Sequence, residues 1–365
     1  MIGTLFIFLI ILAILIFAHE LGHFLAAKKA GVRVDEFGFG FPPRLFSLKK
    51  GETVYSINLI PFGGFVKIYG EQGEGKNEQN SFISKSVGQR AIIITAGVAM
   101  NFLLAVLLLS VGHMTGLPTV IDENEIGGGI VKNQKIQITD VARNSPAEKI
   151  GLKIGDEIRK LKIKSENGKA IDVKKAEDVT NFISGHKGQE VILEIQRGKE
   201  ILDISLVPRE NPPEGEGPIG IALADTAIIS YPWWKSLYKG AEDVVNIIIL
   251  VTVVLAGIIY KAIVGQPVGE VLTGPIGIYT ITSQAAGLGF IYLLQLTAFL
   301  SIQLGLINIF PFPALDGGRL LFLGIEKIKG APVSQKVENI IHTAGFALLI
   351  ALMIFITYKD IVKFF

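Results

Sequence analysis

The sequence contains no cysteine, and charged residues make up only 19% of its 365 residues. The absence of cysteine excludes disulfide bridges, iron–sulfur clusters, thiolate zinc sites and cysteine nucleophiles. Metal or acid–base chemistry must therefore use the side chains of His, Asp and Glu. The formal net charge is only +2. We expect no nucleic-acid partner, because that function needs a markedly basic domain with its basic residues clustered.

Hydrophobic residues are abundant, at 50% of the chain, and the mean hydropathy is +0.49. A soluble domain normally carries about 25% charged residues, so this composition is typical of an integral membrane protein. A bilayer helix needs roughly 20 apolar residues in a row. Four blocks have this character, at residues 2–27, 91–112, 290–310 and 341–358. The composition predicts a polytopic α-helical membrane protein with about four transmembrane helices.

The first block is predicted to be a retained span rather than a signal peptide. It has no basic segment before it, and His19 and Glu20 stand where a signal peptide has small residues at its cleavage site.

The sequence predicts that the chain is organised in four parts. They are an N-terminal membrane part at 1–117, a soluble domain at 118–210, a linker with an interfacial helix at 211–289, and a C-terminal membrane part at 290–365.

Residues 118–210 differ from the rest of the chain because they are charged, patterned as strands and interrupted by turns. The run from Asn144 to Ile158 resembles the corresponding stretch of PDZ domains, which bind peptide ends by adding a strand to a sheet edge. A generic small β-rich module is the alternative. The following residues, 211–218, are dense in Pro and Gly and are predicted to be a linker.

Two further segments are predicted to lie at the membrane without simply crossing it. Residues 54–60 and 65–69 flank Pro61, Phe62, Gly63 and Gly64, which is the pattern of a short apolar β-hairpin over 54–69. Such a hairpin must pack against protein or line a cavity, since its open edges cannot face lipid. Residues 244–259 are apolar but short, with tryptophans just before them. We predict an interfacial or re-entrant helix at about 235–262.

The strongest chemical signal is the sequence His19-Glu20-Leu21-Gly22-His23, an H-E-x-x-H motif inside the first apolar block. Positions i and i+4 of a helix share a face, so His19 and His23 can bind one Zn²⁺ while Glu20 reaches a water on the metal. Two histidines at a helix end with no such role are the alternative. Ionisable residues in an apolar span are costly, which favours the functional interpretation.

A catalytic zinc site usually has three protein ligands and leaves one position for water. Three other histidines remain as third ligands, but the best candidate is Asp316. It follows Pro311 and Pro313, which cannot continue a regular helix and therefore indicate unwound backbone around a cavity. Asn308 is predicted to hold that backbone or to help bind a substrate.

Together the two motifs resemble the site-2 protease family of intramembrane zinc metalloproteases, peptidase family M50, and most closely its bacterial RseP-type, sigma-E-regulating members. Other similar stretches are 38–43, 60–67 and 272–276. The resemblance implies that His19, His23 and Asp316 bind one zinc ion and that Glu20 is the catalytic acid–base. It also implies supporting or substrate-binding roles for a further set of residues, namely Asn308, Pro311, Pro313, Gly63, Gly64 and Asn101.

The resemblance further implies the substrates and their control. These are transmembrane segments of single-pass proteins such as anti-sigma factors, cut first by another protease, and remnant signal peptides. One extracytoplasmic PDZ-like domain would gate their access. The chain departs from the family in two ways. It has Gly97-Val98 where many members have Gly-Pro ahead of Asn101, which puts a local kink in doubt, and it has room for only one PDZ-like segment.

The zinc ligands can meet only with a particular topology. No Lys or Arg occurs through Ala27, whereas residues 28–90 are rich in them, so we expect the N-terminus outside and this loop in the cytoplasm. The active site then lies near the cytoplasmic face of a bacterial inner membrane. For Asp316 to reach that face, residues 244–259 must not cross the bilayer.

Other functions are less consistent with the sequence. A zinc transporter would need more polar ligands deep in several spans, and an inactive scaffold would tolerate loss of Glu20. The run from Gly70 to Lys76 fits G-x-x-x-x-G-K, but Asn77 replaces the Ser or Thr that a nucleotide site needs, so we expect no nucleotide.

Overall fold

The computed structural model describes residues 2–121, 128–164, 170–198, 200–266 and 274–364. Leu272 and Thr273, which belong to one of the family-like stretches, lie outside these residues. The chain divides into two compact units. One comprises Met1–Val111 and Leu237–Phe365, and the other comprises Gly112–Ser236.

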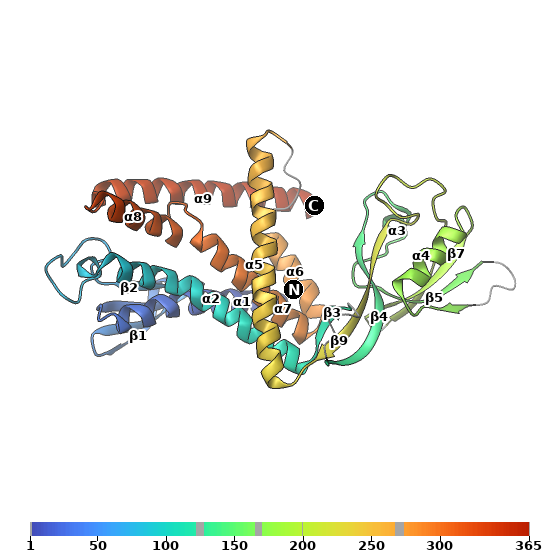
Figure 1. The fold of residues 1–365 in the computed structure, drawn as a ribbon, viewed down its shortest axis with the longest axis horizontal. Helices are drawn as coiled ribbons and strands as arrows, with labels where there is room; N and C mark the ends of the chain where they lie inside the picture. Colours follow the sequence, from blue (N-terminus) through green and yellow to red (C-terminus); the bar gives the residue numbers. More distant parts are fainter. Residues whose placement is uncertain (1, 122–127, 165–169, 199, 267–273, 365) are drawn as a thin grey trace. The chain divides into compact units, whose positions relative to one another are not determined.

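Long apolar helices dominate the first unit (Figure 1). Within the described residues, five are long and apolar enough to cross a membrane. They are α1 (Ile2–Lys29), α2 (Val87–Thr115), α5 (Trp233–Ile263), α7 (Phe290–Ile309) and α9 (Gln335–Phe364). Two shorter helices, α6 (Pro275–Leu288) and α8 (Asp316–Lys329), precede and follow α7. An apolar surface on all sides is what a bilayer helix needs, and the structure supports a polytopic membrane protein.

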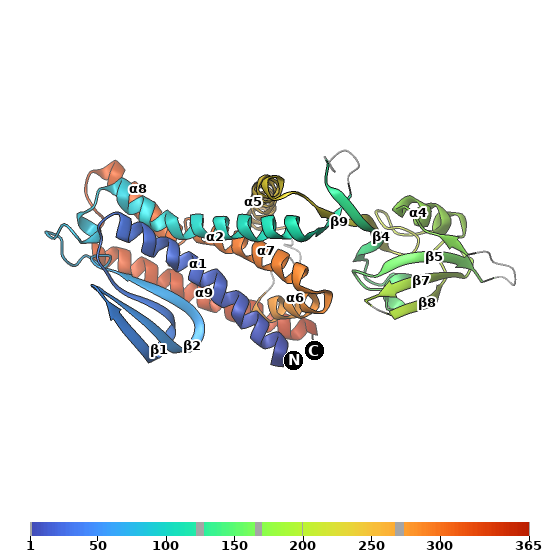
Figure 2. The ribbon, with the colours of Figure 1, turned by 90° about the horizontal axis from the view of Figure 1, so that it is seen from below.

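The direction of the helices brings the two chemical motifs together. Figures 1 and 2 show α1 and α7 running toward the same end of this unit, and α2 and α9 running the other way. The H-E-x-x-H motif is near the end of α1, and Asp316 follows α7, so both reach that shared end.

Helix α5 is arranged differently from the other long helices. In both views it runs across α2 and α7 rather than alongside them (Figures 1 and 2). At the crossing, Val244 packs in one apolar cluster with Ala105 and Leu109 of α2 and with Ala298 and Ile302 of α7. The helix is continuous over 31 residues, which does not fit the re-entrant form of the prediction. Its interfacial form remains a prediction.

The predicted hairpin over 54–69 is wrong in its pairing. The structure has two long strands, β1 (Val34–Lys50) and β2 (Thr53–Ile68), joined at Gly51 and Glu52. The two expected arms both belong to β2, and they do not pair with each other. Residues 64–68 pair with the first part of β1, and residues 54–57 pair with both the first and last parts of β1. Pro61 and the two glycines after it therefore mark a bend within β2 rather than the turn of a hairpin.

The second unit is built on one sheet of seven strands, in the order β3-β9-β4-β5-β7-β8 with β6 beside β5. The strands are β3 (Leu117–Val120), β4 (Ile130–Val141), β5 (Glu157–Ile163), β6 (Ile171–Asp172), β7 (Val191–Arg197), β8 (Glu200–Leu206) and β9 (Ile221–Ser230). Two helices, α3 (Pro146–Lys149) and α4 (Ala176–Gly185), help to close the core.

The core of this unit is made of inward-facing strand residues. Leu161, Leu193 and Ile195 are fully buried on neighbouring strands, and Val179 and Ile183 of α4 pack against the same cluster. The alternation of buried and partly exposed residues along β7 is the pattern of a sheet with one covered face. Residues 211–218 contain no helix or strand, and β9, which follows them, pairs with β3 and β4.

Candidate metal centre

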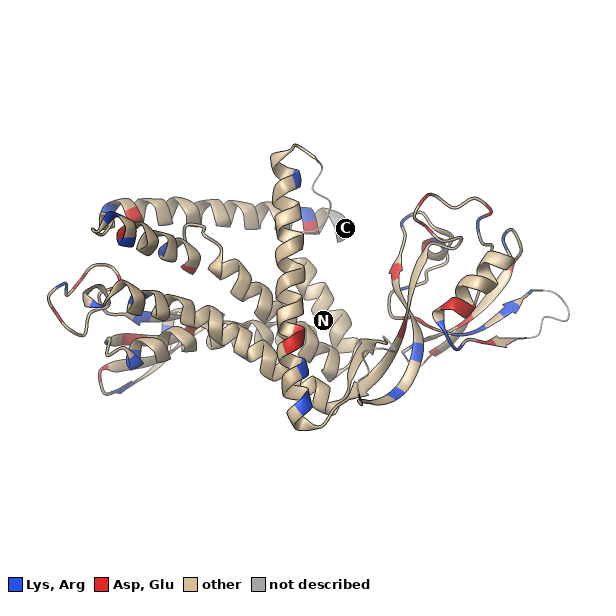
Figure 3. Cartoon of the chain, viewed as in Figure 1, with Lys and Arg blue, Asp and Glu red and all other residues tan. Residues whose placement is uncertain are grey.

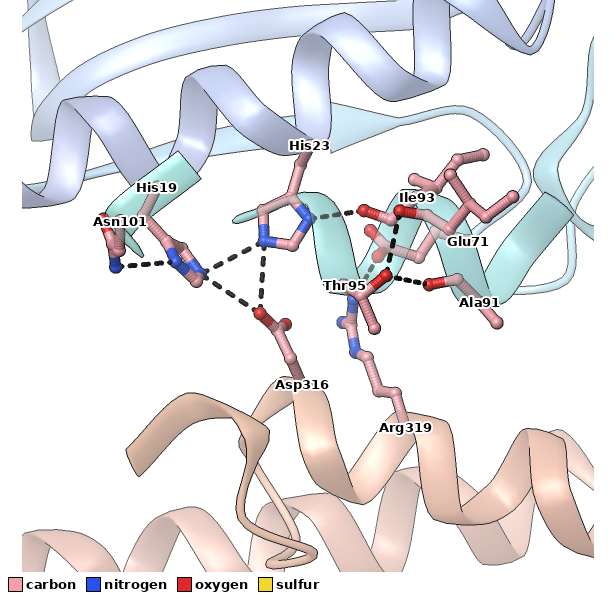
Figure 4. A network of polar contacts seen from close by, with 10 residues as sticks. His19, His23, Glu71, Ala91, Ile93, Thr95, Asn101, Asp316 and Arg319 are labelled. Carbon is pink, nitrogen blue, oxygen red and sulfur yellow. Dashed lines mark hydrogen bonds and ion pairs between the residues drawn. The ribbon is translucent and has the colours of Figure 1, made fainter. Parts of the chain in front are cut away.

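Two imidazoles and a carboxylate converge at the shared end of α1 and α7 (Figure 4). The Nε2 atoms of His19 and His23 lie 3.1 Å apart. Asp316 Oδ2 lies 3.1 Å from the first and 3.2 Å from the second. Both histidines are buried, with 8% and 7% of their surface exposed. Among the described residues, this is the only group of three or more His, Asp or Glu side chains close enough to share a metal ion.

The residues fit zinc. A tetrahedral zinc with bonds of about 2.0–2.1 Å holds its ligand atoms roughly 3.3 Å apart, close to the observed triangle. Asp316 Oδ2 is buried and receives no well-aligned hydrogen bond from the described residues, although both imidazoles are near. Lone pairs that face one another in a buried site are unfavourable without a cation between them. Two nitrogens and one oxygen are also a ligand set that zinc prefers.

Neighbouring groups orient the two imidazoles. His23 Nδ1 lies 2.9 Å from the carbonyl oxygen of Ile93 on α2, which can only accept, so Nδ1 carries the proton and Nε2 is free for a metal. The side-chain nitrogen of Asn101 lies 3.3 Å from His19 Nδ1. Ser301 of α7 donates to the carbonyl oxygen of Asn101 at 2.8 Å. Asn101, which is completely buried, thus lies where it can set the orientation of His19.

Two glycines that the sequence analysis did not select let α1 and α2 approach at this point. A Cβ on Gly97 would lie 2.3 Å from His23 Nε2 and 2.8 Å from His19 Cε1. A Cβ on Gly22, inside the H-E-x-x-H motif, would lie 2.2 Å from the carbonyl oxygen of Ala96. Any side chain at either position would occupy the space of a ligand or of the other helix. Helix α2 runs unbroken through Gly97-Val98, so these residues do not interrupt it.

The segment before Asp316 is tightly wound. Helix α7 ends at Ile309 and α8 begins at Asp316, and no regular helix joins them. Cβ atoms on Gly317 and Gly318 would lie 2.1 Å and 2.4 Å from backbone carbonyl oxygens of this segment, so only glycine fits at both positions. Ala314 has a positive φ of 77°, an uncommon conformation for a residue with a side chain.

Glu20 lies where β2 passes close to α1. A Cβ built on Gly64 of β2 would be 3.5 Å from Glu20 Cγ. A cavity of about 470 Å³ is lined by Glu20 together with the three ligand candidates, and by Phe65 and Val66 of β2 among others. The arrangement places the Glu20 carboxylate, three side chains that can bind a metal, and a strand around one space. It has the parts required for metal-assisted hydrolysis.

None of the six predicted supporting residues lines this cavity. They are Asn308, Pro311, Pro313, Gly63, Gly64 and Asn101. Asn308 is half-buried in the last turn of α7. Pro311 and Pro313 shape the segment before Asp316, and a Cβ on Gly63 would collide with the ring of Phe41. Their positions are consistent with support of the backbone, and their predicted roles remain predictions.

Two ion pairs lie near the metal centre. Arg319, one turn after Asp316 on α8, pairs with Glu71 from the segment after β2 (Figure 4). Arg90 of α2 pairs with Glu326 of α8, with one contact at 3.0 Å. Both pairs line a second cavity of about 510 Å³, and Glu71 and Arg319 line the metal cavity as well. Sequence reasoning missed these pairs because their partners are far apart in the chain.

Comparisons with known proteins agree with this chemistry. The family described as "Peptidase family M50" matches residues 7–352. The chain is 32% identical to "Regulator of sigma-W protease RasP" of Bacillus subtilis, covering 100% of this chain and 99% of the relative. It is 31% identical to "Zinc metalloprotease RasP" of Oceanobacillus iheyensis, covering 99% of each chain. It is 28% identical to "Regulator of sigma E protease" of Haemophilus influenzae, covering 98% of each chain.

The match extends over nearly the whole chain, and the relatives named as zinc metalloproteases align from end to end with it. With the long apolar helices, these bacterial relatives support a multi-pass bacterial membrane protein. The chain belongs to peptidase family M50 and is a zinc metalloprotease.

Proposed function

We propose that this protein hydrolyses peptide bonds within the transmembrane segments of single-pass membrane proteins. The observation that carries the proposal is the convergence of His19, His23 and Asp316, with Glu20 in the same cavity, on helices suited to a bilayer. A site at membrane depth would separate this activity from that of a soluble zinc protease. The same four residues are those that the resemblance to site-2 proteases implies.

His19, His23 and Asp316 would hold one zinc ion, which when bound lowers the pKa of a coordinated water and polarises a carbonyl. Glu20 lines the same cavity as Asp316 and would take a proton from the attacking water. It can then return that proton to the nitrogen of the leaving amine. The Ile93 carbonyl holds the His23 ring in the required tautomer during these steps.

The substrate must be extended at the point of cleavage, because a helix hides its carbonyl groups in its own hydrogen bonds. Strand β2 passes the cavity at Phe65 and Val66, close to Glu20. We infer that an unwound substrate segment adds to this small sheet by main-chain hydrogen bonds, which suit any side-chain sequence. Specificity would then depend on how readily the substrate unwinds.

The names of the relatives support a role in a sigma-factor pathway. They regulate sigma-W in one bacterium and sigma E in another. By extension, the substrates of this chain would be anti-sigma-factor-like proteins trimmed first by another protease, with remnant signal peptides as a second class. The β-rich unit would act as the extracytoplasmic PDZ-like gate that admits trimmed substrates.

The decisive experiment compares the purified wild type with Glu20→Gln on a model single-pass peptide in liposomes. The variant keeps nearly the same shape and leaves the three ligand candidates intact. We expect cleavage by the wild type to depend on zinc and to fall by about 10²–10⁴-fold in the variant, the usual contribution of general acid–base catalysis. Zinc content should be unchanged.

Glu52→Gln is a matched control, because Glu52 is an exposed residue at the turn between β1 and β2. It should cleave like the wild type. Cleavage by Glu20→Gln at the wild-type rate would overturn the assignment of Glu20. Zinc uptake into the liposomes without cleavage of any trimmed peptide would favour the transporter alternative.

A further inference from the structure

The strained turn before Asp316 is held by a helix that is distant in sequence. The backbone N–H of Ala314, the residue with a φ of 77°, donates to Nδ1 of His342 at 2.8 Å. His342 lies in the third turn of α9 and is 28 residues further along the chain. An N–H group can only donate, so Nδ1 of His342 is the unprotonated acceptor.

A second contact fixes the same turn against α9. A Cβ on Gly345 would lie 2.5 Å from Pro313 Cβ and 2.7 Å from the carbonyl oxygen of Pro313. Glycine at this position, one turn after His342, therefore lets α9 lie directly on the turn. Gly317 and Gly318, at the start of α8, lie against backbone carbonyl oxygens of Phe310 and Phe312 in the same segment. The conformation around Ala314 is thus determined by contacts from both helices.

Most of α9 makes no comparable contact. Only 6% of its most apolar stretch is buried in the structure. The ring of His342 in addition lies 5.4 Å from the ring of Phe322 on α8, centre to centre. The early part of α9 is therefore placed by its contact with the turn and with α8, which is the helix that begins at Asp316.

His342 is not itself one of the three converging ligand atoms, which belong to His19, His23 and Asp316. It lines the metal cavity, but its Nδ1 is already used by Ala314. Its Nε2 is 3.9 Å from Glu338 and has no hydrogen bond within the described part of the chain. Its contribution to the centre therefore passes through the backbone of the turn.

We propose that His342 is a positioning residue for the metal centre: by accepting the Ala314 N–H it holds the left-handed turn that aims the Asp316 carboxylate at His19 and His23. Without this acceptor, the N–H of Ala314 loses its partner, and the turn can relax to an ordinary backbone conformation. Asp316 is two residues further on, so relaxation moves it away from the two histidines. This inference rests on the zinc site proposed above.

The test uses the full-length protein in detergent and measures metal affinity by chelator competition, with the visible absorption of bound Co²⁺ as a spectroscopic readout. His342→Leu removes the acceptor and keeps an apolar side chain. His342→Asn is the matched variant, because Asn Oδ1 is as many bonds from the backbone as His Nδ1. His186→Leu, in the β-rich unit, controls for the loss of an imidazole as such.

We expect His342→Leu to bind the metal about 10–100-fold more weakly, as is usual when an outer partner of a metal site is removed. Its Co²⁺ spectrum should shift, because the carboxylate ligand is displaced. His342→Asn should bind within about threefold of the wild type and keep its spectrum, and His186→Leu should match the wild type.

Three outcomes would count against the inference in different ways. Unchanged affinity and spectrum in His342→Leu would show that the turn does not need the acceptor. Equal loss in the Leu and Asn variants would show that the imidazole has another role, such as direct metal binding. Failure of the wild type to bind one metal ion per chain would instead overturn the zinc site itself.

Discussion

At the scale of single residues, the metal centre depends on glycines, which have no side chain, as much as on its ligand side chains. Gly97 has no Cβ, and the space this leaves is occupied by the two imidazoles. Gly97→Ala would place a methyl group 2.3 Å from His23 Nε2, so the ring must move. A misplacement of about 1 Å can cost roughly a hundredfold in rate, and we expect a loss of activity of this size.

Gly88→Ala is the matched control for this prediction. Gly88 lies on the same helix, and nothing lies within 4 Å of the position a Cβ would take. We expect its cleavage rate and metal content to equal those of the wild type. Assays of rate and bound zinc in both variants check the prediction, which fails if the two alanine variants behave alike.

Asp178 provides a residue-scale prediction in the β-rich unit. Its carboxylate accepts the backbone N–H groups of Lys174 and Lys175, each at 2.9 Å, at the start of α4. These two hydrogen bonds hold the pKa of Asp178 below its ordinary value of 3.8. Asp178→Ala should destabilise α4 by about 0.5–1 kcal/mol, at the low end for such caps because the group is exposed.

The pH dependence of this effect has a definite sign. A carboxyl group with a lowered pKa in the folded state stabilises the fold above its ordinary pKa and ceases to do so as the pH falls through the lowered value. The difference between wild type and Asp178→Ala should therefore be full at neutral pH and vanish in acid. Amide hydrogen exchange of α4 measures it, and Glu177→Ala in the same helical turn should show a smaller effect.

A site residue could be predicted from the sequence when it belongs to a short motif of neighbouring residues. His19, Glu20 and His23 share five consecutive positions, and Asp316 stands in a second recognisable motif. Gly97 stood out in the sequence only beside a departure from the family pattern, and His342 had no local signal, because the importance of both arises only when α2 and α9 pack against the motifs. A small residue facing a predicted ligand helix would have been a further hint for Gly97.

At the scale of elements, β1 was the strand missed by sequence reasoning. Phe37, Phe39 and Phe41 alternate with Gly38 and Gly40, which is a period of two, yet glycine and the prolines that follow are rare inside strands. The strand exists because its first part pairs with two different parts of β2. Such double pairing is non-local and leaves no trace in a window of a few residues.

Helix α6 shows another long-range dependence. Its N-cap is Gly274, which has no side chain to accept the first backbone N–H groups. The carboxylate of Asp360 on α9 accepts the N–H of Gly277 at 2.9 Å, and Asp360 itself is buried. A residue from the far end of another helix thus supplies the cap that the local sequence lacks.

Removal of this cap is expected to loosen α6. Asp360→Ala should lower the free energy of unfolding by about 1–2 kcal/mol, the usual cost of losing such a cap, while Asp360→Asn keeps an acceptor and should cost less. Thermal unfolding in detergent measures both variants. Equal destabilisation by Ala and Asn would show that the negative charge, rather than the hydrogen bond, matters at this position.

At the scale of the whole molecule, the apolar blocks predicted four spans and the structure offers five helices of sufficient length among its described residues. The fifth, α5, has 31 residues because the helix starts well before the apolar run that was visible in the sequence, in a stretch that includes Lys235, Lys239 and Asp243. Length and composition cannot decide its orientation. Orientation depends on how it crosses α2 and α7, and that contact is tertiary.

Helix α5 crosses α2 and α7 instead of running beside them (Figures 1 and 2), and most of its acidic and basic residues lie near its beginning (Figure 3). If α2 and α7 span the bilayer, a helix lying across them runs along the membrane and does not traverse it. The contact through Ala105 and Leu109 is in the second half of α2, about two to three turns beyond Gly97. This arrangement favours an α5 that lies at the extracytoplasmic side.

The lack of cysteine makes this prediction directly testable. Single cysteines at Trp234 and Lys261 would mark the two ends of α5, about 40 Å apart along a helix and thus further than the roughly 30 Å of a hydrocarbon core. We expect a membrane-impermeant maleimide to label both from outside intact cells, like a cysteine at the exposed Lys187 of the β-rich unit. A cysteine at Glu52 should react only after permeabilisation. Labelling of the two α5 ends from opposite sides would show that α5 crosses the bilayer. In that case the chain would need one further crossing elsewhere, because Asp316 must reach the same face of the membrane as His19 and His23.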